Sequence, residues 1–205
     1  MSDPRLTVAT RSMGVVALVG LVMLTTGTLW AAHYGKGARS ASTNAPGEPS
    51  CQARKCHTQN ELNSGNGSLQ LAGIPKFYEP LKRYTVTVTL QQEGQKRWGF
   101  QVTALDSNNL PIGDFWLKDE EQTQQKTHTF EDGSVRQYVE HTLKGSFMGQ
   151  LDGPVGWQFG WTAPGKGAGP VYFYTAANAA NFNKKPWGDY IYTHVDTAES
   201  SAPSL

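Results

Sequence analysis

The sequence predicts an all-β domain, a β-sandwich of about nine strands, and three observations support this. The 205-residue chain has 22 glycines, 11 prolines and 11% aromatic residues, a composition that favours a turn-rich β protein. Short segments rich in β-branched and aromatic residues recur, with turn residues such as Asp132-Gly133 between them. Apolar and polar side chains alternate within these segments. Two packed sheets are expected, and a closed barrel is the alternative that fits the same pattern.

Each expected strand is justified by its own pattern. Residues 84–90 alternate strictly, with Val86, Val88 and Leu90 on one face and threonines on the other. The other segments are bounded by turns containing glycine, proline, asparagine or aspartate. The nine expected strands are 68–71, 84–90, 98–105, 112–117, 127–130, 135–143, 156–162, 171–176 and 190–195.

The N-terminal region is predicted to lie outside this domain. Residues 13–32 carry no charge and are long enough to span a bilayer core of about 30 Å. Residues 1–33 are therefore expected to be a membrane anchor, with a cleaved signal segment as the alternative. Residues 34–50 are rich in Gly, Ser, Ala and Pro and predict a flexible linker. The sandwich is then expected over 51–197, followed by a disordered tail over 198–205.

Composition and motifs exclude several classes of function. The chain has 18 basic and 17 acidic residues, a net charge of +1, so no nucleic-acid partner is expected. It contains no nucleophile elbow, zinc-protease motif or phosphate-binding glycine loop. The protein is therefore not expected to be an enzyme. The sequence does not indicate an oligomeric state.

The sharpest local motif is Cys51-Gln-Ala-Arg-Lys-Cys56-His57. Two cysteines followed at once by a histidine are typical of c-type haem attachment, in which both thiols form thioethers and the histidine binds iron. The usual gap between the cysteines is two residues, whereas here it is four. A small Cys51–Cys56 disulfide loop in an oxidising compartment explains the same residues equally well.

Longer stretches resemble a known family. The segments APGEPSCQARKCH, NSGNGSLQL, RYTVTVTLQQEGQKRWGFQVTALD and GPVYFYTAANAAN occur in order within 45–193 and are similar to the bacterial Reeler-like family called choice-of-anchor V. The resemblance implies an immunoglobulin-like sandwich of the haem-carrying type, and Cys51, Cys56 and His57 match the family's cysteine-cysteine-histidine segment. This chain departs from the family in having its predicted anchor at the N-terminus. The eukaryotic Reeler relatives are extracellular modules without haem, so the haem-free alternative stays open.

A second histidine is a candidate iron ligand. Alternation over 135–143 puts His141 on the face shared by Val135, Gln137, Val139 and Leu143, so its imidazole is expected to be buried and to need a hydrogen bond or a metal. We predict His141 as the distal axial ligand opposite His57, although a core histidine with ordinary hydrogen bonds fits the same pattern. The candidates that replace it if it is not the ligand are Met148, His128 and His194.

Two other groups of residues are given structural roles. The asparagine-rich segment 178–189 has one carboxylate, Asp189, which favours loop hydrogen bonding over a calcium site. Most of the tryptophans are expected in the core.

Together these features predict an exported, membrane-tethered monohaem c-type cytochrome. It would carry one covalent haem c and exchange electrons with a redox protein partner. The expected location is the cell membrane, crossed once, with the C-terminal domain in the periplasm or outside the cell. The alternative from another class is a haem-free extracellular binding or adhesion module with a Cys51–Cys56 disulfide.

Overall fold

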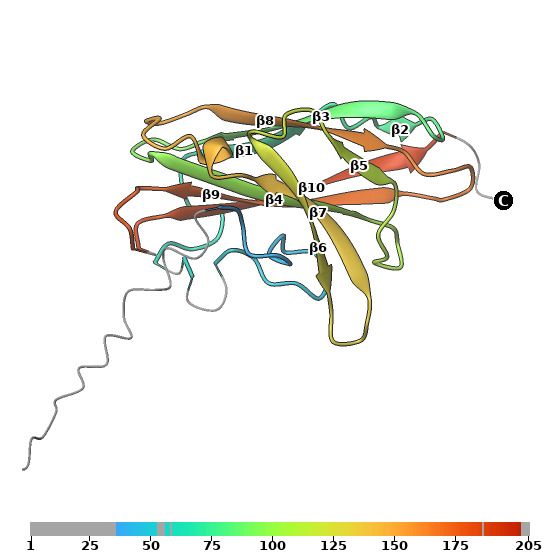
Figure 1. Cartoon of the computed structure of the whole chain (residues 1–205), viewed down its shortest axis with the longest axis horizontal. Helices are drawn as coiled ribbons and strands as arrows, with labels where there is room; N and C mark the ends of the chain where they lie inside the picture. The colour runs from blue at the N-terminus through green and yellow to red at the C-terminus, as the bar shows by residue number, and fades with distance from the viewer. Residues whose placement is uncertain (1–35, 53–55, 58, 186, 202–205) are drawn as a thin grey trace, which may run out of the picture.

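The computed structural model describes residues 36–52, 56–57, 59–185 and 187–201, and these residues form a two-sheet β-sandwich (Figure 1). The smaller sheet has the order β1-β3-β8-β5 and the larger one β2-β10-β9-β4-β7-β6. Within the described residues the two sheets share no strand, so the sandwich prediction is confirmed over the closed barrel. The strands are β1 Ser68–Ala72, β2 Phe77–Tyr78, β3 Arg83–Gln91, β4 Arg97–Leu105, β5 Asp114–Leu117, β6 Thr123–Thr129, β7 Val135–His141, β8 Val155–Thr162, β9 Val171–Ala180 and β10 Tyr190–Ser200.

All nine expected strands are present, with some differences in their bounds. The short strand β2 was not expected; it pairs in parallel with the end of β10. Strand β6 begins at Thr123, four residues before the predicted start. Strand β10 continues to Ser200, past the predicted domain end at residue 197, because its last residues pair with both β9 and β2.

The core lies between the two sheets and is rich in aromatic side chains. Val86, Val88 and Leu90 of β3 are fully buried, as their alternation predicts. They meet aromatic rings from both sheets, and the rings of Phe100 in β4 and Trp157 in β8 lie 4.7 Å apart. Buried aromatic pairs of this kind stabilise a fold beyond the area that they bury. Trp98 and Trp161 are also buried, in agreement with the prediction that most tryptophans are core residues.

We expect Gly160→Ala to destabilise the smaller sheet. A Cβ added at Gly160 would overlap the indole ring of Trp116, which packs across that position from β5. Forcing such overlap costs about 1–3 kcal/mol of the free energy of unfolding. Gly156→Ala in the same strand is the matched control, since its added Cβ would meet only the Val88 carbonyl oxygen at 3.6 Å. Urea unfolding of both variants checks this, and equal stability of the two would contradict it.

The N-terminal segment, by which we mean the described residues 36–52 and 56–57, packs against the outer face of the larger sheet. The outer face is the face turned away from the smaller sheet. Figure 1 shows this segment, in blue, along that face. The backbone of Ser42 donates to Gln101 Oε1 at 2.9 Å, and Gln101 Nε2 donates to the Arg39 carbonyl at 3.1 Å. Thr43 and Glu48 are buried. Residues 36–50 therefore differ from the flexible linker that their composition predicts, because side chains of the sheet satisfy their backbone and polar groups.

Among the residues that the structure describes, no helix is long and apolar enough to cross a membrane. The predicted anchor over 13–32 and the end of the predicted tail lie outside the described residues.

Candidate functional site

The candidate site lies on the outer face of the larger sheet, near the end where β9 turns into β10. Strand alternation defines this face: Trp98 and Phe100 of β4 belong to the core, so Gly99 between them faces outward. Gly99 pairs with Asn178 of β9, and Asn178 pairs with Ile191 of β10. These three residues form one row across the sheet, and the N-terminal segment brings His57 to it.

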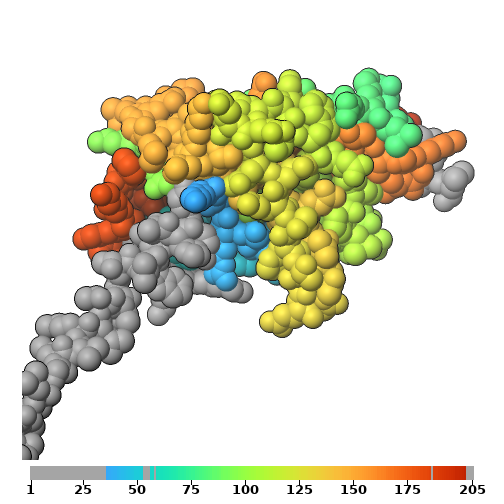
Figure 2. Space-filling view, in the orientation of Figure 1, coloured from blue at the N-terminus to red at the C-terminus, as the bar shows by residue number. Residues whose placement is uncertain are grey.

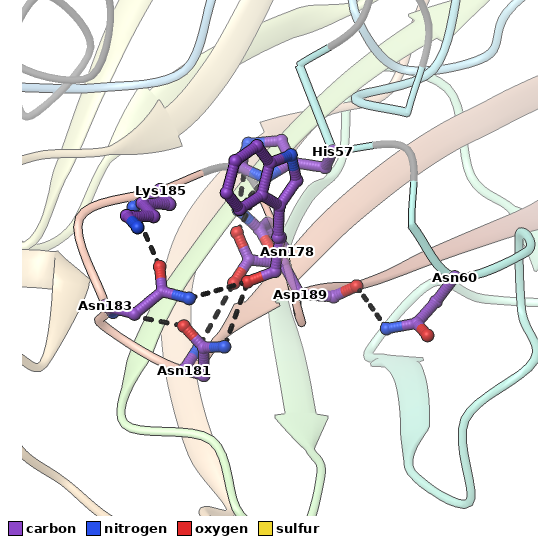
Figure 3. Close-up of polar contacts among 8 residues, drawn as sticks. His57, Asn60, Asn178, Asn181, Asn183, Lys185 and Asp189 are labelled. Atoms are coloured by element: carbon purple, nitrogen blue, oxygen red, sulfur yellow. Dashed lines mark hydrogen bonds and ion pairs between the residues drawn. The ribbon is translucent and has the colours of Figure 1, made fainter. Parts of the chain in front are cut away.

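His57 is held by polar contacts on both of its ring nitrogens (Figure 3). Its Nδ1 lies 2.7 Å from Asp189 Oδ2, and its Nε2 lies 3.2 Å from the side-chain nitrogen of Asn178. The Asp189 side chain is only 3% exposed, against 27% for His57. Asp189 is fixed in turn, since the Asn181 backbone donates to its Oδ1 at 3.1 Å and Asn60 donates to its carbonyl oxygen at 2.9 Å. The carboxylate therefore fixes both the ring orientation and the tautomer in which Nδ1 carries the proton.

His141 lies on the same outer face, and this corrects the face predicted for it. A Cβ added at Gly99 would lie 2.6 Å from Cε1 of the His141 ring, so the imidazole covers the outward side of that glycine. Val135 and Leu143, expected to share its buried face, are 47% and 43% exposed. The reason is that β7 ends at His141, where the strand alternation no longer sets the side-chain direction.

His141 is nevertheless buried, as predicted, and it is neutral at physiological pH. Burial lowers the pKa of its imidazole to about 4, with the nearby Arg97 guanidinium adding to the effect. Its Nδ1 lies 3.2 Å from both the backbone nitrogen and the backbone oxygen of Phe100. When Nδ1 carries the proton and donates to that oxygen, Nε2 holds the lone pair that a metal requires.

The two cysteines sit where the N-terminal segment meets this face. The Cys51 thiol donates to the Ser42 carbonyl oxygen at 3.6 Å. Desolvation by the surrounding chain, and then the neighbouring Cys56, raise the pKa of Cys51 to about 12, although part of the residue reaches solvent. Cys51 is therefore a neutral thiol in this fold and not an activated nucleophile. No disulfide joins the two described cysteines.

The structure thus brings the four predicted site residues to one region of the outer face. Cys51 follows the segment that hydrogen bonds to Gln101, His57 contacts Asn178, and His141 covers Gly99, the strand partner of Asn178. Cys56 directly precedes His57. Among the described residues, no group of three or more His, Cys, Asp and Glu side chains is arranged to hold a bare metal ion.

Sequence reasoning missed the roles of Asp189, Asn178 and Gly99. Asp189 was noted as the only carboxylate of an asparagine-rich segment, but nothing local connects it to His57, which is 132 residues away. The loop role predicted for that segment is confirmed, because Asn181 and Asn183 each donate from the side chain to the Trp187 carbonyl oxygen, at 3.0 Å and 2.9 Å.

Reeler domains are among the solved structures similar to this chain. The Reelin-N domain of F-spondin is 24% identical, with 72% of this chain and 94% of that chain covered and a TM-score of 0.44. The human F-spondin reeler domain is 22% identical, with coverage of 72% and 97% and a TM-score of 0.44.

A cohesin module from a family 33 glycoside hydrolase of Clostridium perfringens is also similar in structure. It is 10% identical, with coverage of 68% and 98% and a TM-score of 0.40. No family model and no curated protein matches the chain.

Proposed function

We propose that this chain is a membrane-tethered monohaem c-type cytochrome whose haem lies on the outer face of the larger sheet. The observation that carries the proposal is the convergence of His57 and His141. They are 84 residues apart, yet His57 contacts Asn178 and His141 covers Gly99, two directly paired residues of adjacent strands. Two imidazoles on one face, with two cysteine thiols on the segment that carries the first, are the protein groups that a six-coordinate haem c requires.

The residues present fit this cofactor by the chemistry of their donor atoms. Cys51 and Cys56 would supply the two thioether sulfurs, and His57 and His141 would each supply a ring nitrogen to the iron. The contact between His57 Nδ1 and Asp189 is the outer contact that metal-bound histidines usually make, and it leaves Nε2 for the metal. Asn178, now 3.2 Å from Nε2, would have to turn its amide away. When bound, the iron supplies one-electron transfer.

The chain's own residues would then set the properties of the site. Gly99 leaves room over β4 for the His141 ring, where a side chain would collide with it. Asp189 orients His57 and increases the electron density of its ring. We propose that residues 1–33 tether this domain to the cell membrane on its periplasmic or outer side, where a redox protein partner delivers or accepts the electron.

A haem-free extracellular binding module is the second candidate, and one observation favours it. Both ring nitrogens of His57 already have protein partners, so the imidazole is satisfied without a metal. In this function Cys51 and Cys56 would form a disulfide that closes the loop between them, and the outer face would present the N-terminal segment to a partner.

A pyridine haemochrome spectrum separates the two functions. The full-length chain is made in a host with a cytochrome c maturation system and extracted with acidified acetone before measurement. A haem that stays with the polypeptide supports the cytochrome. Complete loss of haem, together with an intact mass two hydrogens below that of the reduced chain, would support the disulfide-bearing module instead.

We expect His141→Ala to change the coordination of the iron. A buried neutral imidazole completes a low-spin, six-coordinate site, and its removal should give a high-spin spectrum or one that responds to added cyanide or imidazole. His128→Ala is the matched control, since His128 packs edge-to-face with Phe130 in the β6–β7 hairpin at a ring distance of 4.7 Å. An unchanged low-spin spectrum in the His141 variant would move the role to Met148, His128 or His194.

A further inference from the structure

The loop between β9 and β10 presents two aromatic side chains to solvent. We call residues 181–185 and 187–188 the β9–β10 loop. Trp187 is 55% exposed and Phe182 is 40% exposed, whereas Trp98, Trp157 and Trp161 are buried in the core. Two exposed aromatic side chains on one short loop are a feature of surfaces that other molecules cover. The loop lies beside the candidate site, since Asp189 follows it directly.

Hydrogen bonds within the loop fix its conformation. Asn181 and Asn183 both donate to the Trp187 carbonyl oxygen, and Asn183 Oδ1 accepts from the Lys185 backbone at 2.7 Å. Phe182 and Lys184 hold positive φ angles of 59° and 62°. Non-glycine residues adopt that conformation only where surrounding contacts impose it. The aromatic side chains take no part in these hydrogen bonds, so the conformation of the loop does not depend on them.

The charge around the aromatic pair is positive. Lys184 and Lys185 belong to the loop, and no acidic residue occurs in it. The Lys185 ammonium lies 5.3 Å from the centre of the Trp187 ring, and the Arg97 guanidinium lies 5.7 Å from that of Phe182. Tryptophan with neighbouring lysine is the combination that membrane proteins place at the boundary between lipid and water.

The start of the folded domain lies on the same side of the larger sheet. The Lys36 carbonyl oxygen accepts from Gln124 Nε2 at 2.7 Å, and the same amide group donates to the His141 carbonyl oxygen. The predicted membrane span ends at Ala32, and four residues reach at most about 14 Å. A chain anchored through that span therefore holds the domain against the bilayer. Figure 2 shows the blue start of the domain and the red-orange β9–β10 region on the same side of the molecule.

We propose that the β9–β10 loop is a membrane-contact surface, with Phe182 and Trp187 in the headgroup region of the bilayer and Lys184 and Lys185 beside anionic phospholipid. This contact would fix the orientation of the tethered domain and keep the site next to Asp189 close to the membrane surface. The proposal rests on the proposed membrane tether and not on the haem, so it would still hold if the protein carries no haem.

Lysine footprinting of the full chain tests the proposal. The protein is placed either in vesicles of phosphatidylcholine with phosphatidylglycerol or in micelles of a nonionic detergent, and a membrane-permeant acylating reagent is added. Mass spectrometry then gives the labelling rate of each lysine. We expect Lys184 and Lys185 to react about fivefold more slowly in vesicles. Lys82 and Lys166 are internal controls at the opposite end of the sandwich and should react equally in both.

A double variant, Phe182→Ser with Trp187→Ser, completes the test. The loop's hydrogen bonds use the Trp187 backbone oxygen, which serine retains, so the fold is expected to survive. In vesicles, Lys184 and Lys185 of the variant should label at the rates measured in micelles. Equal rates for the unaltered protein in vesicles and micelles would overturn the proposal. Protection that persists in micelles and disappears on dilution would also overturn it, since a protein partner or a second copy would then cover the loop.

Discussion

Replacing both Cys51 and Cys56 with serine is expected to abolish covalently retained haem. In the proposed attachment, each thiol adds across one vinyl group of the porphyrin, with sulfur bonding one vinyl carbon and hydrogen the other. Serine cannot form this bond. A peroxidase stain for haem on a denaturing gel should therefore mark the unaltered full-length chain and not the double variant, when both are made in the same maturation-competent host.

The two single variants are the matched controls for this experiment. Each retains one thiol, so haem held by one thioether should remain on the gel with a haemochrome band intermediate between those of haem c and free haem. An unaltered chain without haem stain, whose cysteines react with a thiol reagent only after reduction, would contradict the cytochrome and support the disulfide-bearing module. Free haem bound equally by all variants would exclude the thioether attachment.

The strands could be predicted because their information is local. In β3, Val86, Val88 and Leu90 alternate with threonines, and the structure buries these three and leaves the threonines at the surface or partly buried. The bounds of β6 and β10 were harder to predict, because pairing with neighbouring strands extends them into polar sequence. The polar stretch 123–126 carries no apolar periodicity, and its strand form depends on β7.

The packed N-terminal segment could not be predicted from its own residues. Its Gly, Ser, Ala and Pro content is that of a linker, and its order comes from partners on the sheet, such as Gln101. A signal did exist in β7, where Arg136, Tyr138 and Glu140 alternate on the face opposite Val139. All three side chains are buried. A tyrosine and two charged residues on the same face of one strand indicate that another segment of the chain covers that face.

The candidate site was predictable only where its residues are close together in the sequence. The cysteine-cysteine-histidine segment is contiguous, so the motif names Cys51, Cys56 and His57 without any structure. The burial of His141 was also predicted, but its face was wrong because the strand ends there. Asp189 and Gly99 act only through residues distant in sequence, so sequence spacing gives no sign of their roles.

Glu48 is the residue on which the packing of the N-terminal segment most depends. Its carboxylate has no exposed area and receives four hydrogen bonds. Oε1 accepts from the Arg136 guanidinium at 2.7 Å and from the Tyr138 hydroxyl at 2.6 Å. Oε2 accepts from the Thr43 hydroxyl at 2.8 Å and the Thr43 backbone nitrogen at 3.3 Å. One side chain thus joins the turn of the segment to β7.

Glu48→Ala is expected to release the N-terminal segment from the sheet. Removing one partner of a buried ion pair costs about 3–5 kcal/mol, because the other charge stays buried without compensation. Here the chain can avoid part of this cost by detaching the segment, which lets water reach Arg136. Hydrogen exchange should therefore become fast at the Ser42 amide, which donates to Gln101, while the amides of β4 and β9 keep their protection.

Glu121→Ala provides the matched control, because Glu121 and Lys144 form an ion pair whose side chains are 72% and 64% exposed. Exposed pairs contribute about 0–1 kcal/mol, so this variant should keep both its stability and the protection of Ser42. Equal effects of the two substitutions would contradict the assignment of Glu48. The release also reaches the site, since the same segment carries Cys51 and His57. In Glu48→Ala, the nuclear magnetic resonance shifts of the His57 ring should move toward those of a solvent-exposed histidine, because its contact with Asp189 depends on the segment remaining docked.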